Sequence, residues 1–414
     1  MTQQLQIEQS RLQAEIDDLA QISEAEPPVV TRMVFSPADQ RARQWLAAKC
    51  KEANLSLRID AVGNTFARWQ GSFPSAPVVG TGSHIDAIPN AGKYDGVVGV
   101  LGGLEAIRAL QRAHFRPKHS IELLLFTSEE PTRFGIGCLG SRLLAGTLSP
   151  QTAAQLTDNN GDTLDTVRHA AGFTGDLSSV RLPANYYKAF VELHIEQGPI
   201  LEQKKISFGI VQRIAAPASG KIQIEGSGGH AGAVLMADRK DALCAASELI
   251  LAAESAALAT QALDTVATVG ICEVFPGAIN SIPSRVKLAL DVRDTDQARR
   301  DNVMHQISQA AEAISAKRKV SIRTDLLNAD APADCSPLVT QALTDSCRAH
   351  NFPFLEMVSR AYHDSLFISR IAPTAMLFIP CHNGYSHRPD EYSSPEDIAN
   401  GSLVLAETLS RLSS

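Results

Sequence analysis

Four short apolar runs in this chain each lead into a histidine or a pair of carboxylates. The runs are residues 78–82, 121–126, 190–193 and 376–379, and the groups that follow them are His84, Glu129, Glu130, His194 and His387. Short apolar runs bounded by turn residues predict buried strands. In α/β proteins the carboxyl ends of such strands open into the ligand crevice. The pattern therefore predicts a sheet with a chemically active edge.

Helix signals lie between these strands. Ser36, Pro37 and Asp39 have the form of a helix start, and residues 97–114 have a helical pattern. Alternating strands and helices predict an α/β fold. From residue 213 to residue 328 the order changes to strand, helix, two strands, helix, strand, which is a split βαβ arrangement. We therefore predict a mixed-sheet α/β metal-binding catalytic domain, residues 1–212 and 329–414, with an inserted α+β ferredoxin-like domain, residues 213–328.

The composition excludes several classes of protein. The 414 residues carry a formal net charge of -7 without a basic cluster, so no nucleic-acid partner is expected. The N-terminal segment is polar, unlike a signal peptide, and glutamates such as Glu248 and Glu254 interrupt the apolar runs. The 7 cysteines contain no Cys-x-x-Cys pair, which indicates reduced thiols. We expect a soluble, cytoplasmic protein that acts on a small molecule, with no membrane partner.

The polar groups at the strand ends suit metal chemistry. Imidazole and carboxylate ligands are typical of zinc, manganese or cobalt sites, and a shared carboxylate can hold two ions about 3.5 Å apart. Glu129 and Glu130 are adjacent, so one can bind metal while the other takes a proton from the attacking water. Asp86 lies two residues after His84, from where it could orient the imidazole. These patterns favour metal-assisted hydrolysis.

One motif points to a different chemistry. The segment from Gly135 to Gly140 matches the dinucleotide fingerprint Gly-x-Gly-x-x-Gly. It does not directly follow its strand, and Glu129 and Glu130 lie where they would repel a pyrophosphate. A tight turn explains the glycines better, so we do not expect a dehydrogenase.

At these residues the chain resembles the M20 metallopeptidase-related amidohydrolases, in particular the carbamoylase, allantoate and ureidoglycolate branch. The resemblance covers nearly the whole chain. It implies two divalent ions, manganese first, with zinc, cobalt and nickel as alternatives. The metal ligands that it implies are His84, Asp95, Glu130, His194 and His387. Asp95 would bridge the ions, and Glu129 matches the general base.

The resemblance also implies that the inserted domain forms a homodimer and closes over the substrate. His230, in a Gly-His-Ala-Gly segment, would polarise the scissile carbonyl. Asn280 and Arg293 would hold the substrate carboxylate, for which an arginine fork is well suited. Gln197, in the His-Ile-Glu-Gln-Gly segment, is a further candidate for substrate binding.

Two segments depart from the common carbamoylase pattern and resemble ureidoglycolate amidohydrolases. Residues 233–235 read Ala-Val-Leu in place of Thr-Thr-Pro, and residues 360–364 read Arg-Ala-Tyr-His-Asp in place of Gly-Ala-Gly-His-Asp. Tyr362 would narrow the pocket and, with His363, bind a polar substrate. The expected reaction is hydrolysis of the ureido amide of ureidoglycolate, releasing ammonia and leading to glyoxylate, in purine (allantoin) catabolism.

Three alternatives stay open at this point. The substrate could instead be allantoate or an N-carbamoyl-L-amino acid. A non-catalytic binding protein of the same fold is a second reading, although it would be expected to lack Glu129 or a ligand. An aminopeptidase of related fold is the third.

Overall fold

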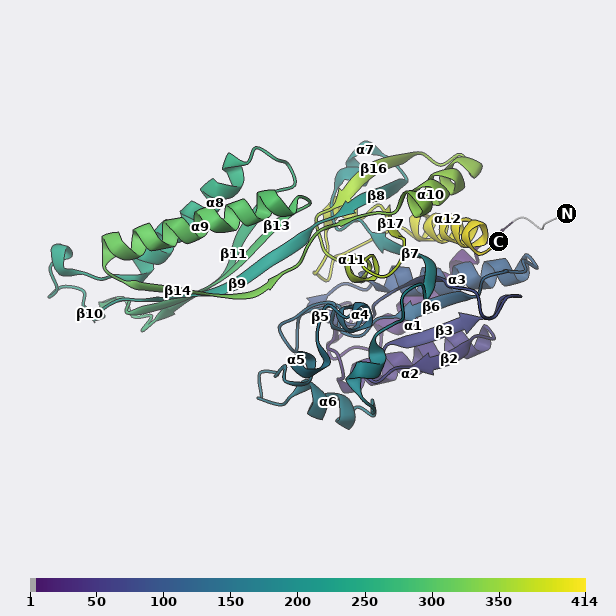
Figure 1. Cartoon of the computed structure of the whole chain (residues 1–414), viewed down its shortest axis with the longest axis horizontal. Helices are drawn as coiled ribbons and strands as arrows, with labels where there is room; N and C mark the ends of the chain where they lie inside the picture. The colour runs from purple at the N-terminus through teal and green to yellow at the C-terminus, as the bar shows by residue number, and fades with distance from the viewer. Residues whose placement is uncertain (1–4) are drawn as a thin grey trace. The chain divides into compact units, whose positions relative to one another are not determined.

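The structure is a computed structural model that describes residues 5–414. The chain divides into two units, which are drawn in Figure 1. Unit 1 extends to Gln212 and resumes over Asp334–Ser359 and His363–Ser414. Unit 2 consists of Arg213–Ala333 and Arg360–Tyr362.

A nine-stranded mixed sheet forms the centre of unit 1. Its strands, in spatial order, are β15 (Ala333–Asp334), β8 (Phe208–Ile214), β17 (Thr374–Ile379), β7 (Tyr187–Ile195), β4 (Val78–Ser83), β6 (Ile121–Leu125), β3 (Thr65–Trp69) and β2 (Ser56–Ile59), with β16 (Phe354–Ser359) paired to β8. The central strands β17, β7, β4 and β6 run parallel, while β8 pairs antiparallel with β17 and β3 with β6. Strands β4, β6 and β17 are buried along their whole length, which explains why the sequence shows them as continuous apolar runs.

Two hydrophobic cores pack on the sheet, one on each face. Along β6 successive side chains alternate between them, so that Leu123 joins one core and Leu124 the other. The first core contains side chains of α1 (Gln9–Ala20), α2 (Pro37–Glu52), α3 (Val97–Arg112), α10 (Pro337–Ala349) and α12 (Pro395–Ser413). The second contains side chains of α4 (Leu139–Ala145), α5 (Pro150–Ala154), α6 (Leu164–Ala170) and α11 (Asp364–Ile368).

Shorter elements complete unit 1. They are the paired strands β1 (Val30–Arg32) and β5 (Ala87–Ala91), helix α7 (Ile200–Lys204) and the 3₁₀ turns η1 (Leu177–Val180) and η3 (His382–Gly384). The predicted start of α2 is confirmed: Ser36 Oγ accepts the Asp39 N–H at 3.2 Å, and Asp39 Oδ2 accepts the Phe35 N–H at 2.8 Å. The first bond satisfies an N–H group that the first helical turn leaves free, and the second fixes the residue before the cap.

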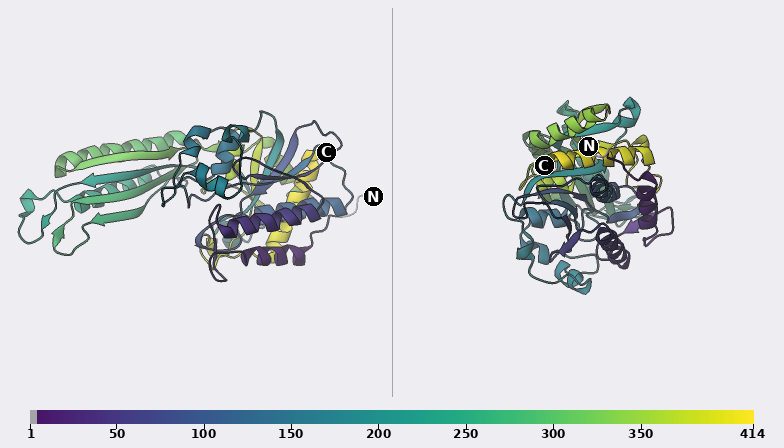
Figure 2. Two further views of the ribbon diagram at one scale, coloured as in Figure 1. Left: turned by 90° about the horizontal axis from the view of Figure 1, so that it is seen from below. Right: turned by 90° about the vertical axis from the view of Figure 1, so that its right-hand side faces the viewer.

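Unit 2 is an antiparallel sheet with two helices on one face. The sheet order is β11 (Val266–Phe275), β13 (Arg285–Asp294), β9 (Ala216–Glu225) and β14 (Ser321–Ala329). Helices α8 (Ala242–Ala259) and α9 (Gln297–Arg318) pack on it, and the left view of Figure 2 shows α9 running along the strands. A small ladder of β10 (Gly229–His230) with β12 (Ser281–Ile282) and the turn η2 (Met236–Asp238) complete the unit.

The boundaries of unit 2 differ from the expected 213–328 at the C-terminal side. The unit runs on to Ala333 and takes in Arg360–Tyr362, which the sequence assigned to the catalytic domain. The contacts of that segment include one ion pair and one stacking contact with unit 2. Arg360 Nη2 lies 2.7 Å from Asp264 Oδ1, and the Arg293 guanidinium lies 5.4 Å from the centre of the Tyr362 ring. Such long-range contacts are not visible in local sequence patterns.

Helix α8 is apolar enough and, with 18 residues, long enough to cross a membrane by length and composition. The expectation that its glutamates interrupt it short of such a length is therefore not met. Its buried face, with Ala245 and Leu249, packs into the core of unit 2. Glu248 lies beside that face and pairs with Lys317 and Arg318 of α9. These contacts pack one face of α8 on the sheet of unit 2.

Candidate metal centre

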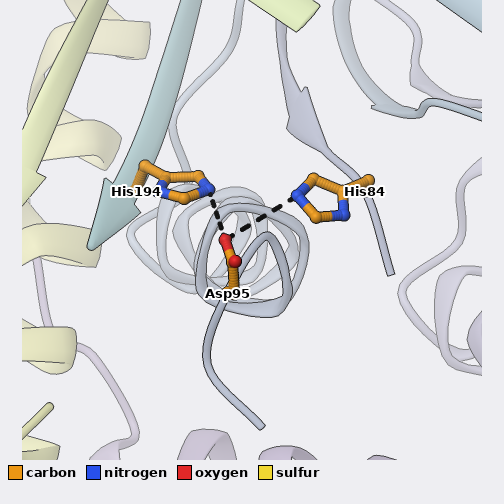
Figure 3. Close-up of side chains that lie close together, drawn as sticks. All are labelled: His84, Asp95 and His194. Carbon is orange, nitrogen blue, oxygen red and sulfur yellow. Dashed lines mark ion pairs between the residues drawn. The ribbon is translucent and has the colours of Figure 1, made fainter. Parts of the chain in front are cut away.

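Asp95 lies between two imidazoles at the carboxyl ends of neighbouring strands. His84 directly follows β4, His194 is close to the end of β7, and Asp95 precedes α3. Asp95 Oδ1 is 3.1 Å from His194 Nε2 and 3.9 Å from His84 Nε2. Figure 3 shows this carboxylate between the two rings. All three side chains are buried. These groups are close enough to share one metal ion.

Backbone carbonyls orient both rings. His194 Nδ1 lies 2.9 Å from the carbonyl oxygen of Ile195, and His84 Nδ1 lies 3.0 Å from that of Asp86. A carbonyl can only accept, so each Nδ1 carries the proton and donates it. In the neutral ring this leaves the Nε2 lone pair facing Asp95, which is the tautomer that a metal requires.

The second oxygen of Asp95 faces another pair of candidate ligands. His387 Nε2 lies 3.0 Å from Asp95 Oδ2 and 3.3 Å from Glu130 Oε1. His387 stands on a loop with φ of 60° and is half-exposed. Asp95, Glu130 and His387 therefore form a second group of metal-ligand type. Because each oxygen of Asp95 belongs to one group, this carboxylate can bridge two ions.

The buried carboxylates strongly affect one another. Burial raises the pKa of Glu130 to about 8, and the charge of Asp95 adds to that rise. Burial, followed by the charge of Glu130, also raises the pKa of Glu129 well above its ordinary value. Burial would raise the pKa of Asp95 too, but hydrogen bonds that the protonated rings of His194 and His387 donate in the absence of metal outweigh it and hold that pKa well below its ordinary value. Closely spaced buried carboxylates are stabilised by cations, so the donor set fits divalent ions of the manganese and zinc type.

Glu129 lies beside the first group. Its Oε2 is 3.8 Å from His84 Nε2, and the Cys138 thiol donates to its Oε1 at 3.5 Å. The side chain is close to the candidate ligands and has a proton donor of its own, which suits a group that exchanges protons near a metal.

The carboxylate of Asp86 contacts other atoms than those expected. It accepts the backbone N–H of Glu129 at 3.3 Å and of Glu130 at 3.0 Å, whereas its Oδ1 is 3.8 Å from His84 Nδ1. The main-chain oxygen of Asp86, not its carboxylate, orients His84. Asp86 thus fixes the loop of the two glutamates, a role that its spacing from His84 did not reveal.

Two residues at the site were not predicted from the sequence. Glu391 Oε1 accepts the backbone N–H groups of Tyr94 at 2.9 Å and Asp95 at 3.0 Å, and Ser386 Oγ lies 3.2 Å from Asp95 Oδ2. Their position on either side of His387 is the one sequence signal that could have indicated them.

Two of the candidate substrate residues lie in unit 1. Gln197 Nε2 lies 3.1 Å from Asp95 Oδ2, so this side chain is at the candidate metal centre. His363 is 2% exposed, its ring centre is 4.5 Å from that of His194, and its Nε2 is 3.1 Å from Ser359 Oγ. His363 therefore packs against a candidate ligand.

The remaining candidates lie in unit 2, in two separate places. Arg293 stands near the end of β13, where it pairs with Asp291 at 2.7 Å and lies over the ring of Tyr362. His230 faces Ser281 across the β10–β12 ladder, and the Ala231 N–H donates to the Asn280 carbonyl at 2.8 Å. The fold thus brings Arg293 together with Tyr362, and His230 together with Asn280.

Comparison with known proteins identifies the family of this fold. The model of peptidase family M20/M25/M40 matches residues 80–411, which is most of the chain. The chain belongs to this family. The family and the fold class that the sequence predicted are confirmed.

This M20 chain is also similar to individual hydrolases along its whole length. A ureidoglycolate hydrolase of Arabidopsis thaliana is 52% identical over 99% of this chain and 87% of the relative. An N-carbamoyl-L-amino acid amidohydrolase of Geobacillus stearothermophilus is 38% identical over 98% of this chain and 99% of the relative. Crystal structures of AtUAH with glyoxylate and with (S)-hydroxyglycine each match at 51% identity and a TM-score of 0.93, over 100% of this chain and 99% of theirs. This M20 chain is a hydrolase.

Proposed function

We propose that this M20 hydrolase cleaves the ureido amide of ureidoglycolate, releases ammonia and leads to glyoxylate, in purine (allantoin) catabolism. The observation that carries hydrolysis is the position of Asp95, whose two oxygens each face a histidine, with Glu129 alongside. The substrate is supported by the 52% identity to a ureidoglycolate hydrolase, against 38% to an N-carbamoyl-L-amino acid amidohydrolase. Allantoate and N-carbamoyl-L-amino acids are the alternative substrates.

The proposed cofactor is a pair of divalent ions, manganese first. His84, His194 and Asp95 Oδ1 would hold one ion, and Glu130, His387 and Asp95 Oδ2 the other. Bound there, such ions polarise a carbonyl oxygen and make water a better nucleophile at neutral pH. Imidazole nitrogens and carboxylate oxygens gather at the carboxyl ends of the parallel strands, which supports this assignment.

Glu129 is the proposed general base. Its carboxylate would take a proton from the attacking water and pass it to the leaving nitrogen. Burial favours this role because it raises the pKa of Glu129, which makes the carboxylate a stronger base.

Arg293 and Tyr362 are the proposed determinants of substrate choice. The guanidinium would bind the substrate carboxylate, and the Tyr362 ring packed against it would limit the space for a substrate side chain. Asp291 orients the guanidinium by accepting from its Nε. A short substrate with a carboxylate and a hydroxyl, such as ureidoglycolate, fits such a restricted site better than a long side chain. Gln197 and His363 are the further proposed substrate contacts, from unit 1.

The two substrate-binding places of unit 2 support a homodimer. His230 and Asn280 lie near the Arg285 end of β13, and Arg293 lies at the other. From Arg285 to Arg293 the strand advances by roughly 25 Å at about 3.3 Å per residue. A molecule of a few carbon atoms cannot reach both ends within one unit 2. We therefore propose that His230 and Asn280 come from the partner subunit.

The surface of unit 2 offers an interface for such a dimer. Strand β11 is an edge strand with unpaired backbone groups, and Ile271 on it is 53% exposed. Leu258 of α8 is 71% exposed. An exposed apolar edge strand is a template for pairing, and a two-fold axis through it would join two sheets. The proposed compartment is the cytoplasm, a choice that seven free cysteines support.

The deciding experiment compares ammonia release by manganese-loaded protein from ureidoglycolate, allantoate and N-carbamoyl-L-leucine, with Glu129→Gln as the control. We expect the highest kcat/KM for ureidoglycolate and no detectable ammonia release by the Glu129→Gln variant. A higher kcat/KM for either other compound would reassign the substrate. If the protein hydrolyses none of the three compounds, the proposed activity is wrong. Hydrolysis of a peptide would indicate an aminopeptidase.

A further inference from the structure

Glu391 connects two loops of the candidate metal centre. The side chain is 4% exposed, and its Oε1 accepts the backbone N–H groups of Tyr94 and Asp95. Its Oε2 lies 2.9 Å from Ser386 Oγ, next to His387. Glu391 therefore holds the loop of one candidate ligand, Asp95, against the loop of another.

This connection requires an unusually close approach of the two loops. A Cβ atom at Gly92 would lie 2.4 Å from Glu391 Cβ and 2.7 Å from Glu391 Oε1. Real Cβ contacts are not that short, so only glycine at position 92 allows the Glu391 carboxylate to reach the Asp95 loop. The contact therefore depends on the residue at position 92 as well as on Glu391.

Ser386 has one hydroxyl proton and two acceptors within reach. Its Oγ is 2.9 Å from Glu391 Oε2 and 3.2 Å from Asp95 Oδ2. The side-chain amide of Gln197 also lies close to Asp95 and Ser386: its Nε2 is 3.1 Å from Asp95 Oδ2 and 3.3 Å from Ser386 Oγ. A hydroxyl donates once and a carboxylate oxygen has two lone pairs. His387 Nε2 also lies 3.0 Å from Oδ2, but as a neutral metal ligand it would have no proton there to donate. If Gln197 uses one lone pair of Oδ2, the other then stays free only when Ser386 donates to Glu391.

We infer that Glu391 is a positioning residue that fixes the direction of the Ser386 hydroxyl. By accepting that proton, it leaves a lone pair of Asp95 Oδ2 for the ion that Glu130 and His387 would share. The inference rests on the two-ion site proposed above. Glu391 would therefore affect the ion held by Glu130 and His387 and not the ion held by His84 and His194. The second of these ions would bind Asp95 Oδ1, which lies 3.9 Å or less from both of its imidazoles.

A glutamine at position 391 would reverse the direction of that hydroxyl. Its amide oxygen must face the N–H groups of Tyr94 and Asp95, since its NH₂ group cannot accept from them. The NH₂ group would then face Ser386 Oγ and donate to it. Ser386 would be left to donate to Asp95 Oδ2, where it competes with the metal. The shape of the loop is kept and only the hydrogen-bond direction changes.

The test is calorimetric titration of metal-stripped protein with MnCl₂, without substrate. Wild-type protein is expected to bind two ions. Glu391→Gln should weaken one binding event about 10-fold or more, as changes to groups that orient metal ligands do, and leave the other within about 3-fold. Ser386→Ala removes the misdirected donor. The double variant Glu391→Gln with Ser386→Ala should therefore recover most of the lost affinity.

The controls separate this role from simple loop support. Glu396→Gln makes the same change on an exposed residue of α12 and should bind both ions as wild type does. Thermal melts by circular dichroism identify any variant that fails to fold; Ser386→Ala then carries the test, because it should bind both ions nearly as wild type.

Each outcome decides between the possibilities. Wild-type binding of fewer than two ions removes the two-ion site and leaves nothing for Glu391 to position. Two-ion binding with unchanged affinity in Glu391→Gln overturns the inference alone. Weakened binding in Glu391→Gln that the Ser386→Ala change does not restore also overturns it, in favour of loop support.

Discussion

His387 Nε2 lies 3.0 Å from Asp95 Oδ2, on the opposite side of the carboxylate from His194. His194 lies near the end of β7 and His387 on the loop that follows η3, yet they share one carboxylate because Asp95 lies between them, just before α3. A bridge between two ions would thus depend on both oxygens of a single side chain.

Replacing Asp95 by asparagine should therefore affect both ions. An amide offers one acceptor oxygen and no charge, so at most one group could keep its oxygen ligand. We expect kcat to fall by about 100-fold or more, the upper end of losses seen when even outer partners of a metal site are changed. Metal analysis after dialysis should find less than one bound ion per chain. Retention of two ions would exclude Asp95 as the bridge.

Replacing Glu129 by glutamine should separate proton transfer from metal binding. The variant keeps the size of the side chain and removes the base, for which losses of about 10²- to 10⁴-fold in kcat are typical. Manganese content should stay at the wild-type value. Glu130→Gln is the matched comparison, since it should lower metal content as well. Equal metal loss in both variants would make Glu129 a ligand instead of the base.

The sequence predicted those parts of the site that follow strands directly. His84, Glu129, Glu130 and His194 each come after a buried apolar run, and parallel strands bring such ends to one edge of a sheet. The resemblance to M20 enzymes added Asp95, which precedes a helix and has no comparable signal of its own. The site residues that the sequence pattern predicted are therefore those that follow adjacent strands of the sheet.

What the sequence did not show are contacts between distant loops. The Glu391 carboxylate accepts the backbone N–H of Asp95 across the fold, and no period or motif connects the two residues. Tyr362 likewise reaches Arg293 from another part of the chain. Asp86 was expected to contact His84 through its carboxylate, but that carboxylate accepts the backbone N–H of Glu130, after the next strand of the sheet. Such contacts depend on tertiary packing, which local patterns do not contain.

The pairing of Glu248 with two cations should make unit 2 less stable in acid. Hydrogen bonds from Arg318 at 2.6 Å and Lys317 at 3.0 Å lower the pKa of Glu248 to about 2. Because the folded pKa is below the unfolded one, this stabilisation is present above about pH 4.5 and is lost as the pH falls towards 2.

Glu248→Gln should accordingly lower the free energy of unfolding at pH 7 by under about 1 kcal/mol, as is typical of pairs near the surface. The difference from wild type should shrink between pH 4.5 and 2, and also in high salt. Denaturant unfolding at several pH values measures it. Glu254→Gln, an exposed position on the same helix, is the control. A difference that persists unchanged at low pH would contradict the ion-pair origin.

The proposed dimer predicts that edge and helix substitutions in unit 2 abolish activity without removing the metal. Ile271→Lys together with Leu258→Glu places charges on the exposed part of β11 and α8. Analytical ultracentrifugation should show a monomer that binds manganese and releases no ammonia, because His230 and Asn280 of the partner subunit are lost. Phe73→Lys, at a 58% exposed position of unit 1, should remain dimeric. An active monomer would show that these two residues act within their own chain.

Substitution of Tyr362 should change substrate preference. Its ring lies over the guanidinium of Arg293, the group proposed to bind the substrate carboxylate. Tyr362→Gly should lower kcat/KM for ureidoglycolate and raise it for N-carbamoyl-L-leucine, with a change in their ratio of about 10- to 200-fold, the range that pocket size alone can give. Tyr362→Phe keeps the ring and loses the hydroxyl, so it should weaken ureidoglycolate turnover without admitting the longer substrate. If both variants change the ratio equally, the hydroxyl and not the ring sets the preference; if neither does, specificity lies elsewhere in the site.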